Sequence, residues 1–353
     1  MWCVVMKKLN VLLIMLFFSF FLVSCNEDAP NIDNTVNRDR LFVVVGGAQP
    51  LVKVIKVVDG SIEINDLFLE KAETSYNYPV KRIKHFGNLF FFVIPQELKI
   101  EVFSADNLNR VSLIDFTDSK KIPSDICFAN ATTAYIAHEN DESLSCLDLT
   151  NFQISGSVTI SGKACAIECS GNQIFTANTF QNTVSIVDSR SNEEIHSITV
   201  ADRPAFLSVA DSGKKVVCVS IGTGKIDDSP TKTASVATSF DVLSSNIIST
   251  KDIGFATINP VEQNPISHAT TVNSLSFVAT KDYLLRFNAK SFSGISLAGR
   301  ANYKQIIYND KKQELIITVE EIGKIFAKIA DQSTAEEKRR VLLPANSVLA
   351  YPL

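Results

Sequence analysis

The stretch IFTANTFQNTVSIVDSRSNEEIHSITVADRPAFLSVADSGKKVVCV, residues 174–219, decides the fold. Short β-rich runs at 174–178, 183–188, 195–200 and within 203–219 are separated by turn residues, and the last run restarts the cycle. A cycle of about forty residues that contains several short strands is typical of proteins assembled from repeated small sheets. The fold can therefore be predicted by counting the cycles, and the function has to be sought in the loops.

The second strand of each predicted cycle is the most regular, and it can be followed along the whole chain. It recurs at 41–45, 89–93, 134–137, 174–177, 216–219, 275–279 and 315–319. The steps are 40 to 48 residues, apart from one of 60 that contains insertions rich in turn residues at 222–233 and 259–265. Such alternating or wholly apolar runs are typical of buried strands. The sequence predicts an all-β fold, a seven-bladed β-propeller of four-stranded antiparallel blades over residues 40–353.

The two ends of this region predict how the ring closes. The first blade begins at its second strand, 41–45, whereas residues 347–351 resemble the start of a cycle that never reaches its second strand. We expect residues 347–351 to supply the innermost strand of the first blade. Joining both ends of the chain in one sheet removes a free sheet edge.

The N-terminal segment has the organisation of an export signal. Lys7 and Lys8 precede an apolar stretch at 9–23, which small residues and a cysteine follow. Its 15 residues fall below the roughly 20 that a membrane-spanning helix needs, so residues 1–24 are predicted to be a cleaved signal. Met1 and Met6 are both candidate start residues. Residues 25–39 are polar and are expected to form a flexible tether.

The residues around the predicted cleavage site resemble those of a bacterial lipoprotein. Leu22-Val23-Ser24-Cys25 resembles a lipobox, and Glu27 and Asp28 resemble the surface-export signal of Bacteroidetes lipoproteins. The resemblance implies that Cys25 is lipidated, and several acyl chains would anchor the chain stably. It further implies an outer-membrane protein exposed at the cell surface, although a periplasmic orientation is open. An ordinary signal followed by a chance cysteine is the alternative.

The charge argues against nucleic-acid binding, and the cysteine positions limit which disulfides can form. Removing Lys7 and Lys8 from the net charge of −4 leaves −6, with no basic run, so nucleic-acid binding is not expected. Outside the signal and Cys25, the five cysteines at 127, 146, 165, 169 and 218 are an odd number, so at least one is unpaired. Cys165 and Cys169 would lie about 13 Å apart on one strand and cannot bridge each other or share a metal. A disulfide elsewhere is left open.

Residues 174–178, 182–188 and 204–219 resemble the YVTN family of β-propeller repeats. In that family a V-Y-V-T-N-like strand is followed by N-T-V-S-V-I-D and then by P-x-x-V-A-V-S-P-D-G-K. A lipid-anchored protein with such repeats is similar to the surface propellers of Bacteroidetes. Some of these bind ligands beside a TonB-dependent transporter, and a corrinoid-binding group is among them. The resemblance concerns the class only, because no residue here matches a corrinoid motif.

The antiparallel strand order predicts where a ligand would bind. Loops between blades and loops between the second and third strands meet at one mouth of the channel, where loops on a rigid scaffold carry function. Aromatic, histidine and arginine side chains there suit a large, partly polar ligand. The candidates are Gln49, Tyr76, Tyr78, His138, Asn178, Phe180, Asp202, Arg203, His268, Arg300 and Tyr303. His85 and His196 lie on predicted strands and are expected to be structural.

Catalytic signatures are missing from the sequence. It contains no G-x-S-x-G, H-E-x-x-H or P-loop motif, and we expect no cofactor and no metal centre. Asp227 and Asp228 leave a calcium site open. The leading hypothesis is a non-enzymatic surface protein that captures a small molecule, in its most specific form a corrinoid-like one, for a TonB-dependent transporter. The alternatives are a structural or adhesive protein that binds proteins or glycans and, third, a hydrolase or lyase acting in the channel.

Overall fold

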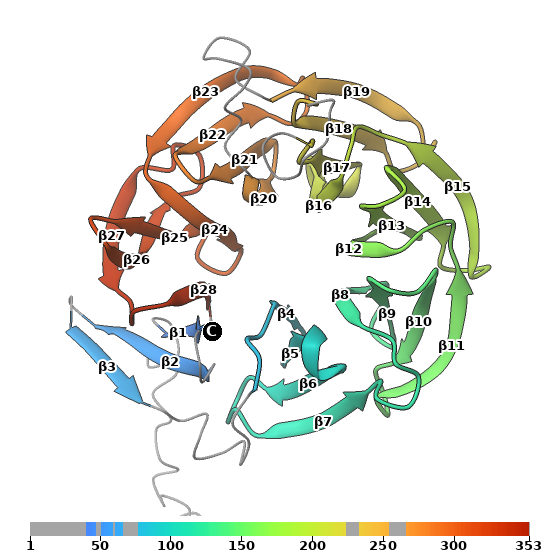
Figure 1. The fold of residues 1–353 in the computed structure, drawn as a ribbon, viewed down its shortest axis with the longest axis horizontal. Coiled ribbons are helices and arrows are strands. Elements are labelled where there is room, and N and C mark those ends of the chain that lie inside the picture. The colour runs from blue at the N-terminus through green and yellow to red at the C-terminus, as the bar shows by residue number, and fades with distance from the viewer. Residues whose placement is uncertain are drawn as a thin grey trace, which may run out of the picture. The chain divides into compact units, whose positions relative to one another are not determined.

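Seven four-stranded sheets stand around a central axis in the part of the chain that the computed structural model describes (Figure 1). The described residues are 40–46, 51–58, 61–65, 77–223, 233–253 and 266–352. The chain divides into two units, 1–38 and 39–353, and all described residues belong to the second. The predicted signal, Cys25 and the whole tether lie outside the described residues.

Each blade runs from an innermost strand at the axis to an outermost strand at the rim (Figure 1). The innermost strands are β28 (Ser347–Pro352), β4 (Arg82–Phe86), β8 (Pro123–Phe128), β12 (Ala164–Ser170), β16 (Pro204–Ala210), β20 (Ile266–Val272) and β24 (Asn302–Asn309). The second strands are β1 (Arg40–Val45), β5 (Leu89–Ile94), β9 (Thr133–His138), β13 (Gln173–Asn178), β17 (Lys215–Ser220), β21 (Leu275–Thr280) and β25 (Glu314–Glu321). All seven second strands that were counted from the sequence are confirmed.

The outer half of each blade completes the sheet. The third strands are β2 (Leu51–Val58), β6 (Lys99–Ser104), β10 (Ser143–Asp148), β14 (Thr183–Asp188), β18 (Val236–Asp241), β22 (Tyr283–Asn288) and β26 (Lys324–Asp331). The fourth strands are β3 (Ser61–Asn65), β7 (Arg110–Asp115), β11 (Gln153–Thr159), β15 (Glu193–Thr199), β19 (Ile247–Asp252), β23 (Ser293–Arg300) and β27 (Glu337–Leu342). Two short 3₁₀ turns, η2 (Pro95–Glu97) and η3 (Asp211–Gly213), complete the described elements.

The C-terminal strand closes the ring, as predicted. The first sheet has the order β28-β1-β2-β3, and β28 pairs antiparallel with β1 so that Ala350 lies opposite Val43 and Tyr351 opposite Phe42. Ala350 is fully buried in a cluster that includes residues of β25, β26 and β27 in the last blade. The chain's last strand thus joins the first blade and packs against the seventh.

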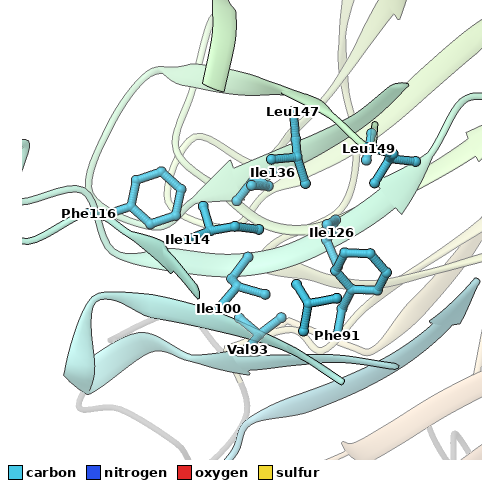
Figure 2. Packing of buried hydrophobic residues seen from close by; sticks show 11 residues of the cluster. Phe91, Val93, Ile100, Ile114, Phe116, Ile126, Ile136, Leu147 and Leu149 are labelled. Carbon is cyan, nitrogen blue, oxygen red and sulfur yellow. The ribbon is translucent and has the colours of Figure 1, made fainter. Parts of the chain in front are cut away.

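Apolar side chains between neighbouring blades form the core. Between the second and third blades, Phe91, Val93 and Ile100 face Ile126 and Ile136, and the cluster excludes water (Figure 2). Between the first and second blades, the Phe42 ring lies edge-on to Phe90 and Phe92, with centroids 4.9 and 5.2 Å away. Each large apolar side chain buried in this way contributes about 1.5–3 kcal/mol. The second strands are therefore mostly buried and largely apolar, as in β5 and β17.

One disulfide joins two blades. Cys127 on β8 and Cys169 on β12 are bonded, with Cα atoms 5.7 Å apart, and they are separated by 42 residues in sequence. Cys146, Cys165 and Cys218 are free thiols. Cys165 and Cys169 lie on the same strand, β12, and are not bridged to each other, which confirms that part of the sequence argument. A structural disulfide is typical of proteins that fold outside the reducing cytoplasm.

We expect the Cys127→Ser/Cys169→Ser variant to lose about 2–4 kcal/mol of unfolding free energy, because a cross-link over a loop of this length restricts the unfolded chain. Urea unfolding of the variant and of the wild type, with and without reductant, measures the loss. The reductant should lower the wild-type midpoint and leave the variant unchanged. An unchanged wild-type midpoint in strong reductant would contradict a stabilising bridge.

Candidate functional site

The innermost strands enclose a channel with a cavity of about 350 Å³. In the six innermost strands from β4 to β24, strand pairing places one residue of each strand at the same height, opposite the later part of its second strand. We call this set the mouth ring, and it consists of Arg82, Asp125, Ala166, Phe206, His268 and Gln305. Two residues further along the strands, a second ring includes Lys84, Glu168, Ser208, Thr270, Ile307 and Tyr351. The six side chains of the mouth ring lie far apart in sequence, and the closed ring of blades brings them together.

A repeated β-bulge turns five of the six mouth-ring side chains, all but Arg82, toward the channel. The register shifts between Pro123 and Asp125 and between Pro204 and Phe206, and β12, β20 and β24 have a shift at the corresponding place. A bulge adds one residue to a strand and re-aims the side chain that follows it. Each of these mouth-ring residues directly follows the bulge of its strand.

Opposite charges are paired across the second to fourth blades. Asp125 is buried, and its carboxylate lies 3.4 Å from Arg82 Nε and 3.8 Å from Lys84 Nζ. It also accepts hydrogen bonds from the backbone N–H groups of Ile126, at 2.9 Å, and Ile167, at 3.3 Å. Lys84 Nζ donates to Glu168 Oε1 at 2.8 Å. Burial lowers the pKa of Lys84, but Asp125 and Glu168 outweigh burial and raise it above its ordinary value.

Three polar atoms of the mouth ring are buried without a hydrogen-bond partner. They are Arg82 Nε, His268 Nδ1 and Gln305 Oε1. The His268 ring lies beside the Phe206 ring, with centroids 5.4 Å apart. Burial, together with the positive charges of Arg82 and Lys84, lowers the pKa of His268 to about 3, so this imidazole is neutral at pH 7. The channel therefore offers the Arg82 Nε–H, which is ion-paired with Asp125 but makes no hydrogen bond, two polar atoms without hydrogen bonds on neighbouring blades, and one aromatic face.

The buried histidines predict an acid-sensitive fold. Burial and Lys121 lower the pKa of His138 to about 4, while His268 lies near 3. Both values are below the ordinary 6.5, so the unfolded chain takes up protons first as the pH falls. Unfolding free energy should drop from pH 6.5 to 5 by at most roughly 1.4 kcal/mol per pH unit for each histidine. Urea unfolding at several pH values should show this slope, and His268→Asn should reduce it; an unchanged slope would contradict the assignment.

Three of the expected ligand-binding side chains belong to the scaffold. His138 and Asn178 are fully buried at the ends of β9 and β13, and Tyr303 is 5% exposed on β24. His138 Nε2 lies 2.8 Å from Ser145 Oγ, and Asn178 Nδ2 donates to the Ser185 hydroxyl at 2.8 Å. The expectation that these three side chains stand at a loop rim was wrong, because the second strand extends to include the first two and the inner strand includes Tyr303.

The remaining candidates are spread over different environments. Tyr78, Phe180 and Arg300 are exposed, Phe180 to 77%. Asp202 accepts a hydrogen bond from Asn182 Nδ2, and the backbone N–H of Arg203 donates to Asn182 Oδ1, so this pair shapes a corner between blades. Gln49, Tyr76, Asp227 and Asp228 lie outside the described residues. Among the described candidates, His268 alone lines the channel.

Sequence reasoning missed Arg82, Asp125, Phe206 and Gln305. It expected ligand contacts from loops, whereas these residues lie near the starts of innermost strands. A signal was present at two of them, because Pro123 and Pro204 each stand two residues before the channel residue. A proline at the first position of a strand next to a bulge is typical, because it cannot donate to the ladder.

A second, wider cleft lies on the mouth side where the last blade meets the first. It has a volume of about 860 Å³ and is lined by residues of both blades, including Lys304, Leu342 and Val348. Lys304 Nζ is paired with Glu320 Oε2 at 2.8 Å. The cleft presents aliphatic side chains and one satisfied ion pair.

The described residues hold no group of three or more His, Cys, Asp or Glu side chains placed to bind a metal ion. None of their helical segments has the length and apolarity needed to cross a bilayer.

Comparison with known proteins agrees with the architecture. No family model matches the chain, and neither does any curated protein. Among solved structures, it is similar to the hydrazine synthase of Kuenenia stuttgartiensis, with a TM-score of 0.55 and 12% identity over 75% of this chain and 84% of that one. It is also similar to the Neurospora crassa Pan2 WD40 domain, with a TM-score of 0.56 and 8% identity over 79% and 86% of the two chains. The likeness shows the propeller fold alone, and the YVTN resemblance stays a prediction.

Proposed function

We propose that this propeller is a non-enzymatic binding protein that holds a small molecule in its central channel. The observation that carries the proposal is the set of buried polar atoms without a hydrogen bond at Arg82, His268 and Gln305, which border one cavity. A buried polar atom without a partner costs about 1–3 kcal/mol, so a ligand that satisfies several of them gains affinity. The sequence offers no recognised catalytic motif beside them.

The finer form of the proposal places the protein at the cell surface. The lipobox-like residues before Cys25 support a lipid anchor, and capture for a TonB-dependent transporter is the most specific role. A corrinoid is larger than a cavity of about 350 Å³, so such a ligand would lie over the mouth rather than inside the channel. Cys25→Ala should abolish incorporation of labelled palmitate in cells, and retained label would overturn the anchor.

A second candidate function is the binding of a protein partner at the mouth side. Phe180 in the β13–β14 turn is 77% exposed, and Ile322 in the β25–β26 turn is completely exposed. Both turns connect second and third strands and therefore project from the mouth. Apolar side chains at exposed positions of this kind suit a transporter or another surface protein.

Ligand binding in the channel can be tested without knowing which ligand it binds. The purified chain is incubated with a small-molecule extract of cells, separated by gel filtration, and its retained compounds are identified by mass spectrometry. The matched control is Thr270→Trp, which fills the channel at the second ring. We expect at least one compound to be retained ten times more by the wild type. Equal retention by the two proteins, with equal melting temperatures, would show that the channel is not the site.

A further inference from the structure

Two unpartnered polar atoms occupy neighbouring blades of the mouth ring. His268 on β20 pairs with Ala279, and Gln305 on β24 pairs with Thr318, so both stand at the same height in the channel. His268 Nδ1 and Gln305 Oε1 are buried, and neither makes a hydrogen bond. The amide oxygen is an acceptor, so the role of the imidazole nitrogen decides what the pair recognises.

The unpartnered nitrogen of His268 carries a lone pair. The ring is neutral because burial lowers its pKa to about 3, and a neutral imidazole has one N–H and one acceptor nitrogen. The backbone of Ile306, on the next blade, favours a proton on the ring. Nδ1 has no hydrogen bond, so the donor is Nε2 and Nδ1 is the acceptor. The mouth ring thus presents two adjacent acceptors that lack donors.

The charges around the ring select against ionic ligands. A carboxylate or phosphate would face two lone pairs, and the cations that could attract it are already paired with Asp125 and Glu168. A cationic ligand gains no net attraction either, because Asp125 and Glu168 are balanced by Arg82 and Lys84, which also disfavour a positive charge at His268. The remaining class is a neutral molecule that donates hydrogen bonds.

The shape of the site favours a flat molecule. The Phe206 ring lies beside His268 and offers an aromatic face on which planar rings stack. Arg82 Nε supplies one buried donor without a hydrogen-bond partner, and apolar Ala166 and Ile307 contribute to the walls. A ligand that fits has N–H groups on one edge and a carbonyl oxygen on another.

We propose that the mouth ring binds a neutral, planar heterocycle with cyclic amide groups, in the manner of a nucleobase. Its N–H groups donate to His268 Nδ1 and Gln305 Oε1, and a ring carbonyl accepts from Arg82 Nε. The proposal rests on the proposed function of the channel and names the chemical class of its ligand.

The test compares uracil with 1,3-dimethyluracil, which keeps the ring and both carbonyls but lacks the two N–H donors. Isothermal titration of the purified chain should give at least tenfold tighter binding of uracil. Gln305→Leu should weaken uracil binding at least tenfold and leave the melting temperature equal or higher, because it removes a buried unsatisfied acceptor. Gln153→Leu, an exposed glutamine on the outer strand β11, is the matched control and should change neither quantity.

Each other outcome overturns the inference in a recognisable way. Equal binding of the two compounds would show that the N–H groups are not recognised. Binding of benzoate or glucose in place of uracil, lost in Gln305→Leu, would replace the ligand class and leave the channel as the binding site. Binding of no probe would reject the heterocycle, whereas the proposed function is decided separately by the extract experiment, which assumes no ligand class.

Discussion

Removal of residues 347–353 is expected to abolish cooperative folding of the propeller. Without β28, β1 has an open edge at the axis, and the first blade loses the strand that contacts β24 and β25 of the last blade. Ala350, fully buried against Leu41 and Val43, and Tyr351, packed against the Phe42 cluster, are lost with it. The unfolding free energy of a domain is only about 5–15 kcal/mol. We expect the stabilisation lost with β28 to exceed it.

Circular dichroism and thermal unfolding of the truncated chain measure this effect. Ala350→Glu is the matched single substitution, because it keeps the strand but places an unpaired charge in the buried cluster, at a cost of several kcal/mol. Val348→Glu, at a neighbouring position that is 45% exposed, should change stability little. A truncated chain that melts as the wild type does would show that ring closure is not needed for stability.

Asp125→Ala is expected to lower the unfolding free energy by about 3–5 kcal/mol, because it removes the buried carboxylate of the cluster and leaves the largely buried Arg82 without its counter-ion. Arg82 Nε loses its contact at 3.4 Å, Lys84 loses one at 3.8 Å, and two backbone N–H groups lose their acceptor. Urea unfolding at constant pH measures the change.

A neighbouring ion pair provides the control. Lys81 Nζ and Glu139 Oε2 are 2.9 Å apart, closer than either contact of Asp125, but their side chains are 38% and 37% exposed. Exposed pairs contribute about 0–1 kcal/mol, so Glu139→Ala should have a small effect. Equal losses in the two variants would show that burial does not set the strength of the channel pair.

The number of blades could be read from the sequence because each second strand is a short apolar run of its own. Residues 89–93 and 315–319 each form a mostly buried strand. Their apolar composition can be recognised without knowing which distant residues they contact. The closing strand at 347–351 was predictable for the same reason, since a cycle that stops before its second strand needs a neighbour. Of the site, His268 was named from the sequence, although it was expected in a loop and lies on β20.

Local sequence settled which segments are strands, and the closed ring settled which side chains meet. Arg82, Phe206 and Gln305 are far apart in the chain and share one cavity only because seven sheets stand around one axis. Phe206 and Gln305 each follow a bulge one residue long, and a shift of one residue moves a side chain to the other face of a strand. The Cys127–Cys169 bridge depends on the same register across two blades. The strand register at these positions is set by packing between blades. The sequence of a single repeat does not contain that information.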